Sequence, residues 1–305
     1  MQSVAVGIPL ALAASVALNT SFLVQHAGAV DLPAVSLRRP LATLRTLAGS
    51  RTWLGGLGLG CTGWALHVAA LTRAPLSLVQ AFVAGGVALT LPLAAVGLKH
   101  RVRRRERHGV ALMVLALVLL SLGLRGGRHA GAPPLVLAGA ILGLMACAGA
   151  LALRARGERR PMGLGVAGGL LYGAADIATK ALTGVAAESG AAAVLSSPWL
   201  PAAAGATVAA FFAFQRGLQT PHPVVVIGLM TAATNVSTIL GGLVVFGDPL
   251  GSTPPLAVLH ALAFALVAIA AWRLVPAQAT LAARRHPRRP GRTAAAGSAC
   301  GRHAS

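Results

Sequence analysis

The sequence predicts an all-α integral membrane protein, a polytopic bundle of about nine transmembrane helices with an inverted-topology internal repeat. Three observations lead to this fold class. Of the 305 residues 56% are hydrophobic and only 10% are charged, whereas a soluble domain carries about 25% charged residues. Long apolar runs follow one another along the chain, and basic residues collect in alternate loops between them.

The apolar runs are measured against the roughly 20 residues that one helical crossing needs. The first run follows no basic segment, so it is expected to be a retained span and not a cleaved signal peptide. The run at 108–124 is short, and the run at 197–216 begins uncertainly after a proline-containing stretch. Spans are expected at 3–25, 52–72, 75–97, 108–124, 134–153, 162–185, 197–216, 222–246 and 255–275.

The positions of Lys and Arg predict how these spans are oriented. Of the 26 such residues, all but four lie in the loops after odd-numbered spans, in the C-terminal tail, or at the span ends next to them. Because basic loops stay in the cytoplasm, the N-terminus is expected outside and the C-terminus inside. Residues 276–305 are expected to form a basic, disordered cytoplasmic tail. This topology accounts for the net charge of +20, so nucleic acid is not an expected partner.

The chain also repeats itself. The stretches ALHVAALTRAPLSLV and AFFAFQRGLQTPHPVV each end one span, turn at a proline and enter another. Matching spans lie five apart, and an odd number of crossings reverses the orientation of the second copy. We therefore expect residues 1–275 to form one transporter domain with its site near the midplane. It comprises repeat one at 3–124, a linking span at 134–153 and repeat two at 162–275.

Two charged residues stand inside the apolar run at 162–185. Asp176 and Lys180 are four residues apart, so a helix places them on nearly the same face. Because a charge inside a membrane costs several kcal/mol, both are functional candidates. One interpretation is a mutually compensating pair facing a pathway, with Asp176 contacting the solute or carrying a proton. The other is that Lys180 snorkels to the outer surface and Asp176 neutralises it or is protonated.

Small residues share the face of this predicted pair. Glycines at 165, 169 and 173 form a small-xxx-small pattern in the same stripe as Tyr172, which predicts that this face packs against protein.

A second polar stripe occurs in the run at 222–246. Thr231, Thr234, Asn235 and Thr238 recur at spacings of three and four, which predicts one polar face on an apolar helix. This face is expected either to bind a solute or to hydrogen-bond between helices. Gln80 and His67 in the first half are isolated polar residues, candidates for solute binding or for satisfied interior positions.

Catalytic and metal-binding patterns are missing from the sequence. It has no HExxH, GxSxG or P-loop motif and no pair of carboxylates inside a span, so we expect neither an enzyme nor a cofactor. Of the six acidic residues one lies deep in a span, which argues against a dedicated site for a divalent cation. An enzyme acting on lipid-linked substrates would need clustered catalytic groups at one membrane face. The basic loop at 99–107 offers charge without a nucleophile or a base, so this alternative is not favoured.

The stretches GWALHVAALTRAPLSLVQ, LLYGAADIATKAL and GGLVVFGDPLG resemble the drug/metabolite transporter superfamily, most nearly its EamA-type and NIPA-like branch. The likeness covers residues 3–275. It implies a helical bundle that moves small solutes by alternating access, and some relatives move magnesium. The family pattern has an acidic turn residue in both halves. This chain has Lys99, His100 and Arg101 in the first half and keeps Asp248 in the second, which argues against a mechanism that needs both.

The expected function is a secondary transporter or facilitator for a small polar or amphipathic solute. A Mg²⁺ transporter of NIPA-like type and a non-transporting membrane scaffold are the alternatives. The expected partners are the solute and the lipid bilayer of the plasma membrane, and assembly as a homodimer is left open.

Overall fold

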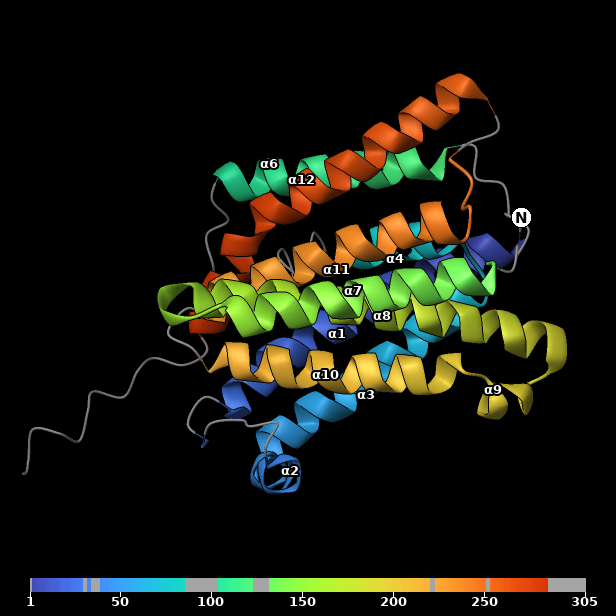
Figure 1. Cartoon of the computed structure of the whole chain (residues 1–305). Helices are drawn as coiled ribbons and strands as arrows, with labels where there is room; N and C mark the ends of the chain where they lie inside the picture. Colours follow the sequence, from blue (N-terminus) through green and yellow to red (C-terminus); the bar gives the residue numbers. More distant parts are fainter. Residues whose placement is uncertain are drawn as a thin grey trace, which may run out of the picture.

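A computed structural model describes residues 2–29, 32–33, 39–85, 104–122, 132–219, 223–250 and 253–284, which form helices and no strand. The long helices run side by side as one bundle (Figure 1). The helices are α1 (Gln2–Ala29), α2 (Pro40–Ala48), α3 (Arg51–Leu71), α4 (Leu76–Gly85), α6 (Arg104–Ser121), α7 (Pro134–Arg154), η1 (Gly157–Arg159), α8 (Arg160–Ser189), α9 (Ala193–Ser196), α10 (Trp199–Leu218), α11 (Pro223–Val245) and α12 (Pro254–Arg284).

Each expected span overlaps one of the longer helices, although the part of 75–97 beyond Gly85 lies outside the described residues. Within the described ranges, five helices are long and apolar enough to cross a membrane: α1, α3, α7, α8 and α11. The chain is therefore a multi-pass membrane protein. The crossings by the remaining helices, and the inverted repeat, stay predictions.

One predicted boundary is wrong. The tail was expected to begin at residue 276, but α12 continues to Arg284. Its last turns contain Ala, Leu, Gln and Arg, which are good helix formers, so the helix can extend past the apolar run. Residues 285–305 lie outside the described part of the chain.

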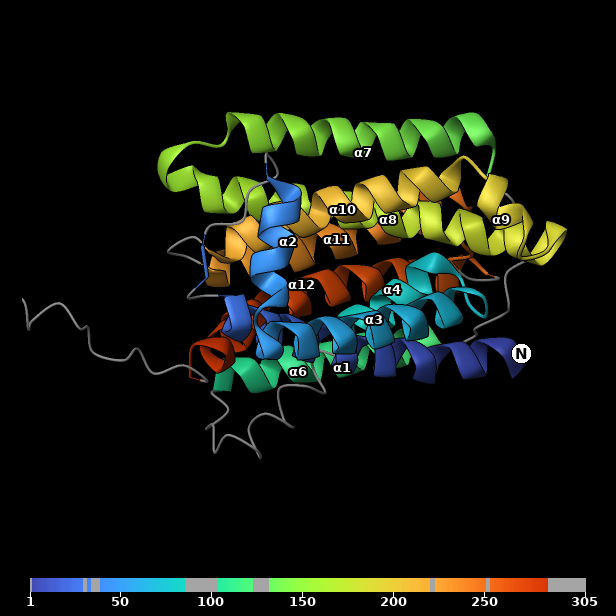
Figure 2. The same ribbon diagram turned by 90° about the horizontal axis from the view of Figure 1, so that it is seen from below.

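The helices pack in groups that the views of Figures 1 and 2 separate. α1 lies along α3, α8 is surrounded by α7, α10 and α11, and α6 lies along α12. α4 contacts both α1 and α11. The outer face of α7 carries large apolar side chains, and Leu135 is 87% exposed and Leu153 79% exposed. Such a surface is suited to lipid and not to water.

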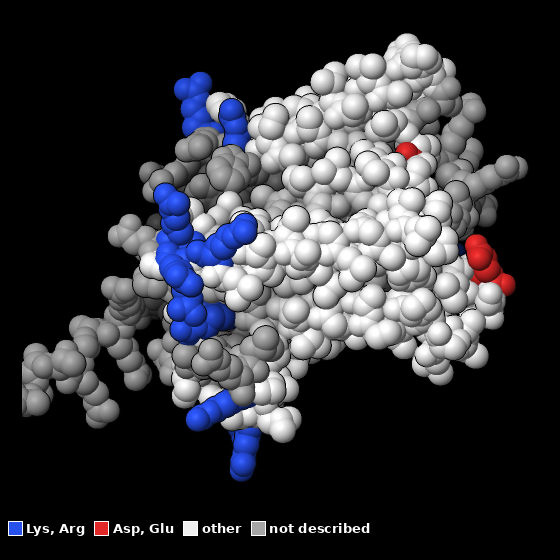
Figure 3. Space-filling view, viewed as in Figure 1, with Lys and Arg blue, Asp and Glu red and all other residues white. Residues whose placement is uncertain are grey.

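The charged residues mark the two ends of the bundle. Figure 3 shows Lys and Arg gathered at one end, Asp and Glu at the other, and a band of uncharged residues between them. The α7–α8 connection lies at the basic end, and α1 begins at the opposite end (Figure 1). The described basic residues of the loops after odd-numbered spans therefore share one side of the bundle, as the alternation along the sequence predicts.

Close approach of α8 to α11 depends on glycine. A Cβ at Gly169 would lie 2.4 Å from the carbonyl oxygen of Met230, and one at Gly173 would lie 2.0 Å from Oγ of Ser237. A Cβ at Gly165 would lie 2.9 Å from the carbonyl oxygen of Val226. The glycine pattern thus faces protein, as predicted, and brings the backbone of α8 against α11.

Replacing Gly169 by alanine should destabilise the bundle, because the backbone oxygen in its way belongs to a helix and cannot move aside cheaply. We expect Gly169→Ala to lose about 1–3 kcal/mol, measured as a lower melting temperature of the purified protein in detergent. Gly184→Ala is the matched control, since nothing lies within 4 Å of a Cβ there. Alanine favours the helix, so the control should melt no lower than the native protein. Equal melting of the two variants would contradict this packing.

Candidate functional site

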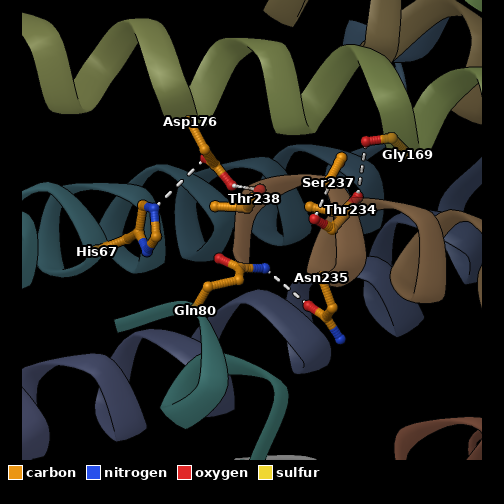
Figure 4. A network of polar contacts seen from close by, with 8 residues as sticks. All are labelled: His67, Gln80, Gly169, Asp176, Thr234, Asn235, Ser237 and Thr238. Carbon is orange, nitrogen blue, oxygen red and sulfur yellow. Dashed lines mark hydrogen bonds and ion pairs between the residues drawn. The ribbon is translucent and has the colours of Figure 1, made fainter. Parts of the chain in front are cut away.

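Polar side chains from four helices meet between α3, α4, α8 and α11 (Figure 4). Asp176 of α8 is at the centre. Its Oδ1 lies 3.4 Å from Nε2 of His67 on α3, and its Oδ2 accepts a hydrogen bond of 3.2 Å from Oγ1 of Thr238 on α11. The side chain of Asp176 is 17% exposed and that of His67 is 4% exposed. The carboxylate is therefore partly accessible although its neighbours are buried.

His67 lies within ion-pair distance of Asp176 but makes no hydrogen bond to it. The separation is within ion-pair range, but neither ring nitrogen makes a hydrogen bond to any described residue. A buried polar nitrogen without a partner is costly. The position therefore suits a group that another molecule, such as a solute or water, completes.

An amide pair lies next to this contact. Nε2 of Gln80 on α4 donates a 2.7 Å hydrogen bond to Oδ1 of Asn235 on α11, and both side chains are buried. Among the described residues, Oε1 of Gln80 and Nδ2 of Asn235 have no hydrogen-bond partner. Two amides joined by one hydrogen bond leave one acceptor and one NH₂ group unpaired whichever way they are turned. In Figure 4 the free atom of Gln80 lies on the side of His67, Asp176 and Thr238.

Lys180 is not where either interpretation of the sequence placed it. It neither pairs with Asp176 nor snorkels to the surface. Its Nζ donates hydrogen bonds to the carbonyl oxygens of Leu71, at 2.7 Å, and of Ala74, at 3.0 Å, and the residue is 7% exposed. The physical reason is that α3 ends at Leu71 and presents carbonyls without helical partners, which attract a cation.

Asp248 binds the other side of the α3–α4 turn, at the start of α4. Its Oδ2 accepts a 2.7 Å hydrogen bond from the backbone N–H of Ser77, in the first turn of α4. Helix N-termini favour a carboxylate because their first N–H groups lack partners. Lys180 and Asp248 thus hold the carbonyl end of α3 and the amide end of α4, and we call these two residues with the α3–α4 turn (72–75) the clasp.

The predicted stripe on α11 divides between two roles. Asn235 and Thr238 belong to the central cluster, whereas Oγ1 of Thr234 bonds to the carbonyl oxygens of Met230 and Gly169 and so joins α11 to α8. Thr231 is partly buried, one turn before Asn235. Tyr172, one turn before Asp176, packs against the apolar cluster of Phe214, Val226 and Met230.

A second buried polar contact, which the sequence does not predict, lies near the basic end. Nε2 of Gln215 on α10 donates a 2.7 Å hydrogen bond to Oε1 of Gln25 on α1. Gln25 in turn donates to Oγ of Ser21 at 2.8 Å, and Oε1 of Gln215 has no hydrogen-bond partner in the described part of the chain. Glycines 56 and 60 of α3 allow this contact, because a Cβ at either would collide with Gln25 or Ser21. Gln215 precedes Arg216, so in the sequence it resembled an ordinary span end.

The amide pair predicts a coupled loss of stability. Gln80→Met and Asn235→Leu each leave one buried amide without its partner, which should cost about 1–3 kcal/mol. The double variant removes both amides and should lose less than the sum of the single losses. Melting temperatures of the four proteins in detergent give the coupling. Strictly additive losses would show that the two side chains do not depend on each other.

Comparison with known proteins gives one relative. Over 122 residues the chain is 29% identical to a "Probable magnesium transporter" of Candida albicans (strain SC5314 / ATCC MYA-2876). The match covers 40% of this chain and 33% of the relative, so the chain matches about a third of the relative's length. No family model matches the chain, and no solved structure matches it at a significant level.

Proposed function

We propose that the protein is a secondary transporter or facilitator, and not an enzyme, which moves a small polar solute across the membrane by alternating access. The observation that carries this proposal is the set of polar atoms on His67, Gln80 and Asn235 that lie around Asp176 without hydrogen-bond partners among the described residues. The similarity to a named transporter supports the same class of function.

The position of the cluster fits a solute site. Asp176 lies near the middle of α8, and Asn235 lies near the middle of α11. Both are therefore distant from the bundle ends, where water would satisfy them. Burying a polar group in such an interior costs free energy unless another group forms a hydrogen bond with it. A solute that has shed its water can supply that partner and leave again.

The charge of the cluster favours a solute that carries an amine. Asp176 provides a carboxylate, and Lys180 does not neutralise it by a direct bond because its Nζ is engaged with the carbonyls of α3. An ammonium or amine group can donate to the carboxylate and to Oε1 of Gln80 together. The unpaired NH₂ group of Asn235 can in turn donate to an oxygen of the same solute.

Mg²⁺ is the second candidate, favoured by the name of the relative. The donor set is less suited to it. Mg²⁺ prefers oxygen ligands, including carboxylates, in near-octahedral geometry, and the described residues hold no group of three or more His, Cys, Asp or Glu that could bind a metal. A free NH₂ group beside the site cannot act as a metal ligand.

Transport assays in proteoliposomes test this proposal. We expect uptake of small primary amines, and not of their N-acetylated forms, because acetylation removes the charge that Asp176 attracts. Asp176→Asn should abolish most of this uptake, while Glu188→Gln, an exposed acid at the end of α8, should leave it unchanged. Uptake of Mg²⁺ in place of amines would favour the second candidate. Folded protein that moves neither would favour the scaffold.

We further infer that the basic end faces the cytoplasm, because loops rich in Lys and Arg are retained there. Cysteines introduced in place of Arg156, in the α7–α8 connection, and Glu188, at the far end of α8, should then label from opposite sides. The background protein would have its three native cysteines replaced by serine. In intact cells an impermeant thiol reagent should modify position 188 and spare position 156. The reverse pattern would invert the topology.

A further inference from the structure

The α1–α3 pair makes few direct helix contacts with the α8–α10 pair. α1 and α3 pack closely on each other, as do α8 and α10, whereas the backbones of the two pairs seldom approach each other among the described residues. Near the basic end aromatic side chains do cross the boundary, because Phe22 of α1 packs edge-on against Phe214 of α10, and Trp53 of α3 packs edge-on against Phe211.

Polar side chains cross this boundary at three levels. Lys180 crosses it at the clasp, His67 and Asp176 meet in the middle, and Gln215 reaches Gln25 near the basic end.

The order of these levels follows the helices. Lys180 lies one turn beyond Asp176 on α8, about 6 Å along its axis. On α3, His67 lies next to Asp176, while Gly56 and Gly60, two to three turns away, lie against Gln25 and Ser21. Asp176 is thus bracketed by two buried polar contacts, one toward each end of the bundle.

We propose that these two contacts are the gates of the pathway, Lys180 on the acidic side and the Gln25–Gln215 pair on the basic side. The assignment rests on the transport function proposed above. Each contact joins the α1–α3 pair to the α8–α10 pair, and on the basic side the aromatic contacts Phe22–Phe214 and Trp53–Phe211 accompany it. Separation of the pairs at one end, with its contact broken and the other contact intact, is the movement that alternating access requires.

The two gates differ in their chemistry. At the clasp an ammonium group bonds to two carbonyls, and the carboxylate of Asp248 holds the adjoining amide. Hydrogen bonds that involve a charged group are roughly twice as strong as neutral ones. The Gln25–Gln215 contact is a single bond between neutral amides, and one oxygen of Gln215 is unpaired.

Lys180 also has an alternative partner when the clasp opens. Asp176 stands four residues earlier on the same helix, the spacing and order that favour a salt bridge within a helix. An ammonium group that leaves the carbonyls of α3 inside an apolar bundle needs another partner at once. The carboxylate of Asp176 provides it, so opening of the clasp competes with binding of an amine at Asp176. Lys180 therefore links the state of one gate to the occupancy of the site.

Thiol accessibility tests the sidedness of the gates without any solute. Thr238→Cys, beside Asp176, is made in protein whose three native cysteines are serine, and the protein is reconstituted into vesicles in one orientation. An impermeant maleimide is then applied from either side. Lys180→Met should raise the labelling rate several-fold from the acidic side alone, and Gln215→Leu should raise it from the basic side alone.

Matched controls lie at each end of the bundle, outside the two gates. Glu188→Gln removes an exposed charge at the acidic end of α8, and Arg154→Met removes an exposed charge at the basic end of α7. Both should label as slowly as the parent protein. The proposal is overturned if folded gate variants label as slowly as the parent, or faster from both sides equally. Fast labelling of the parent would also overturn it, whereas failed uptake with correct labelling would refute only the solute assignment.

Amide hydrogen exchange of residues 72–80 tests whether Lys180 changes its partner from the carbonyls of α3 to Asp176. This segment contains the N–H of Ser77 that Asp248 holds, so its exchange reports brief opening of the clasp. Lys180→Met should speed its exchange. Asp176→Asn should slow it, because the open clasp loses its alternative partner. If both variants speed exchange, or Asp176→Asn leaves it unchanged, Lys180 only supports the fold and the exchange of partners is refuted.

Discussion

An ammonium group held away from water by backbone carbonyls is the interaction on which the arrangement of the bundle depends. Lys180 has lost its hydration, and its Nζ bonds to the oxygens of Leu71 and Ala74. The cost of burying the charge is tolerable only while the end of α3 stays within reach. That requirement places the α3–α4 turn against α8. Because the turn joins α3 to α4, it brings His67 of α3 and Gln80 of α4 toward Asp176.

Glycine provides the second constraint, on the opposite face of the cluster. Because α8 and α11 approach each other at Gly169 and Gly173, the hydroxyl of Thr238 reaches Asp176 and the amide of Asn235 reaches Gln80. A side chain at either glycine would separate the helices and lengthen both bonds. The central cluster is therefore a product of two packing requirements, a charged one at the α3–α4 turn and a steric one along α8.

The sequence predicted the helices better than the contacts. Apolar runs report the length of a span because the membrane sets that length, and charges inside a run stand out, so Asp176 and Lys180 were identified. Their partners were not predictable. Lys180 bonds to backbone carbonyls, which every residue has, and Gln215 stands at a span end where a polar residue is common. The choice between a pair, a surface position and a backbone contact depends on which helix end lies nearby, and that is a property of the tertiary fold.

The engagement of Lys180 elsewhere changes what the site can bind. Had it paired with Asp176, the cluster would be neutral, and a solute with little charge would fit it best. With the ammonium group on α3, the carboxylate faces His67, Thr238 and an amide without a full set of partners. A cationic solute would therefore meet a carboxylate that no lysine neutralises by a direct bond.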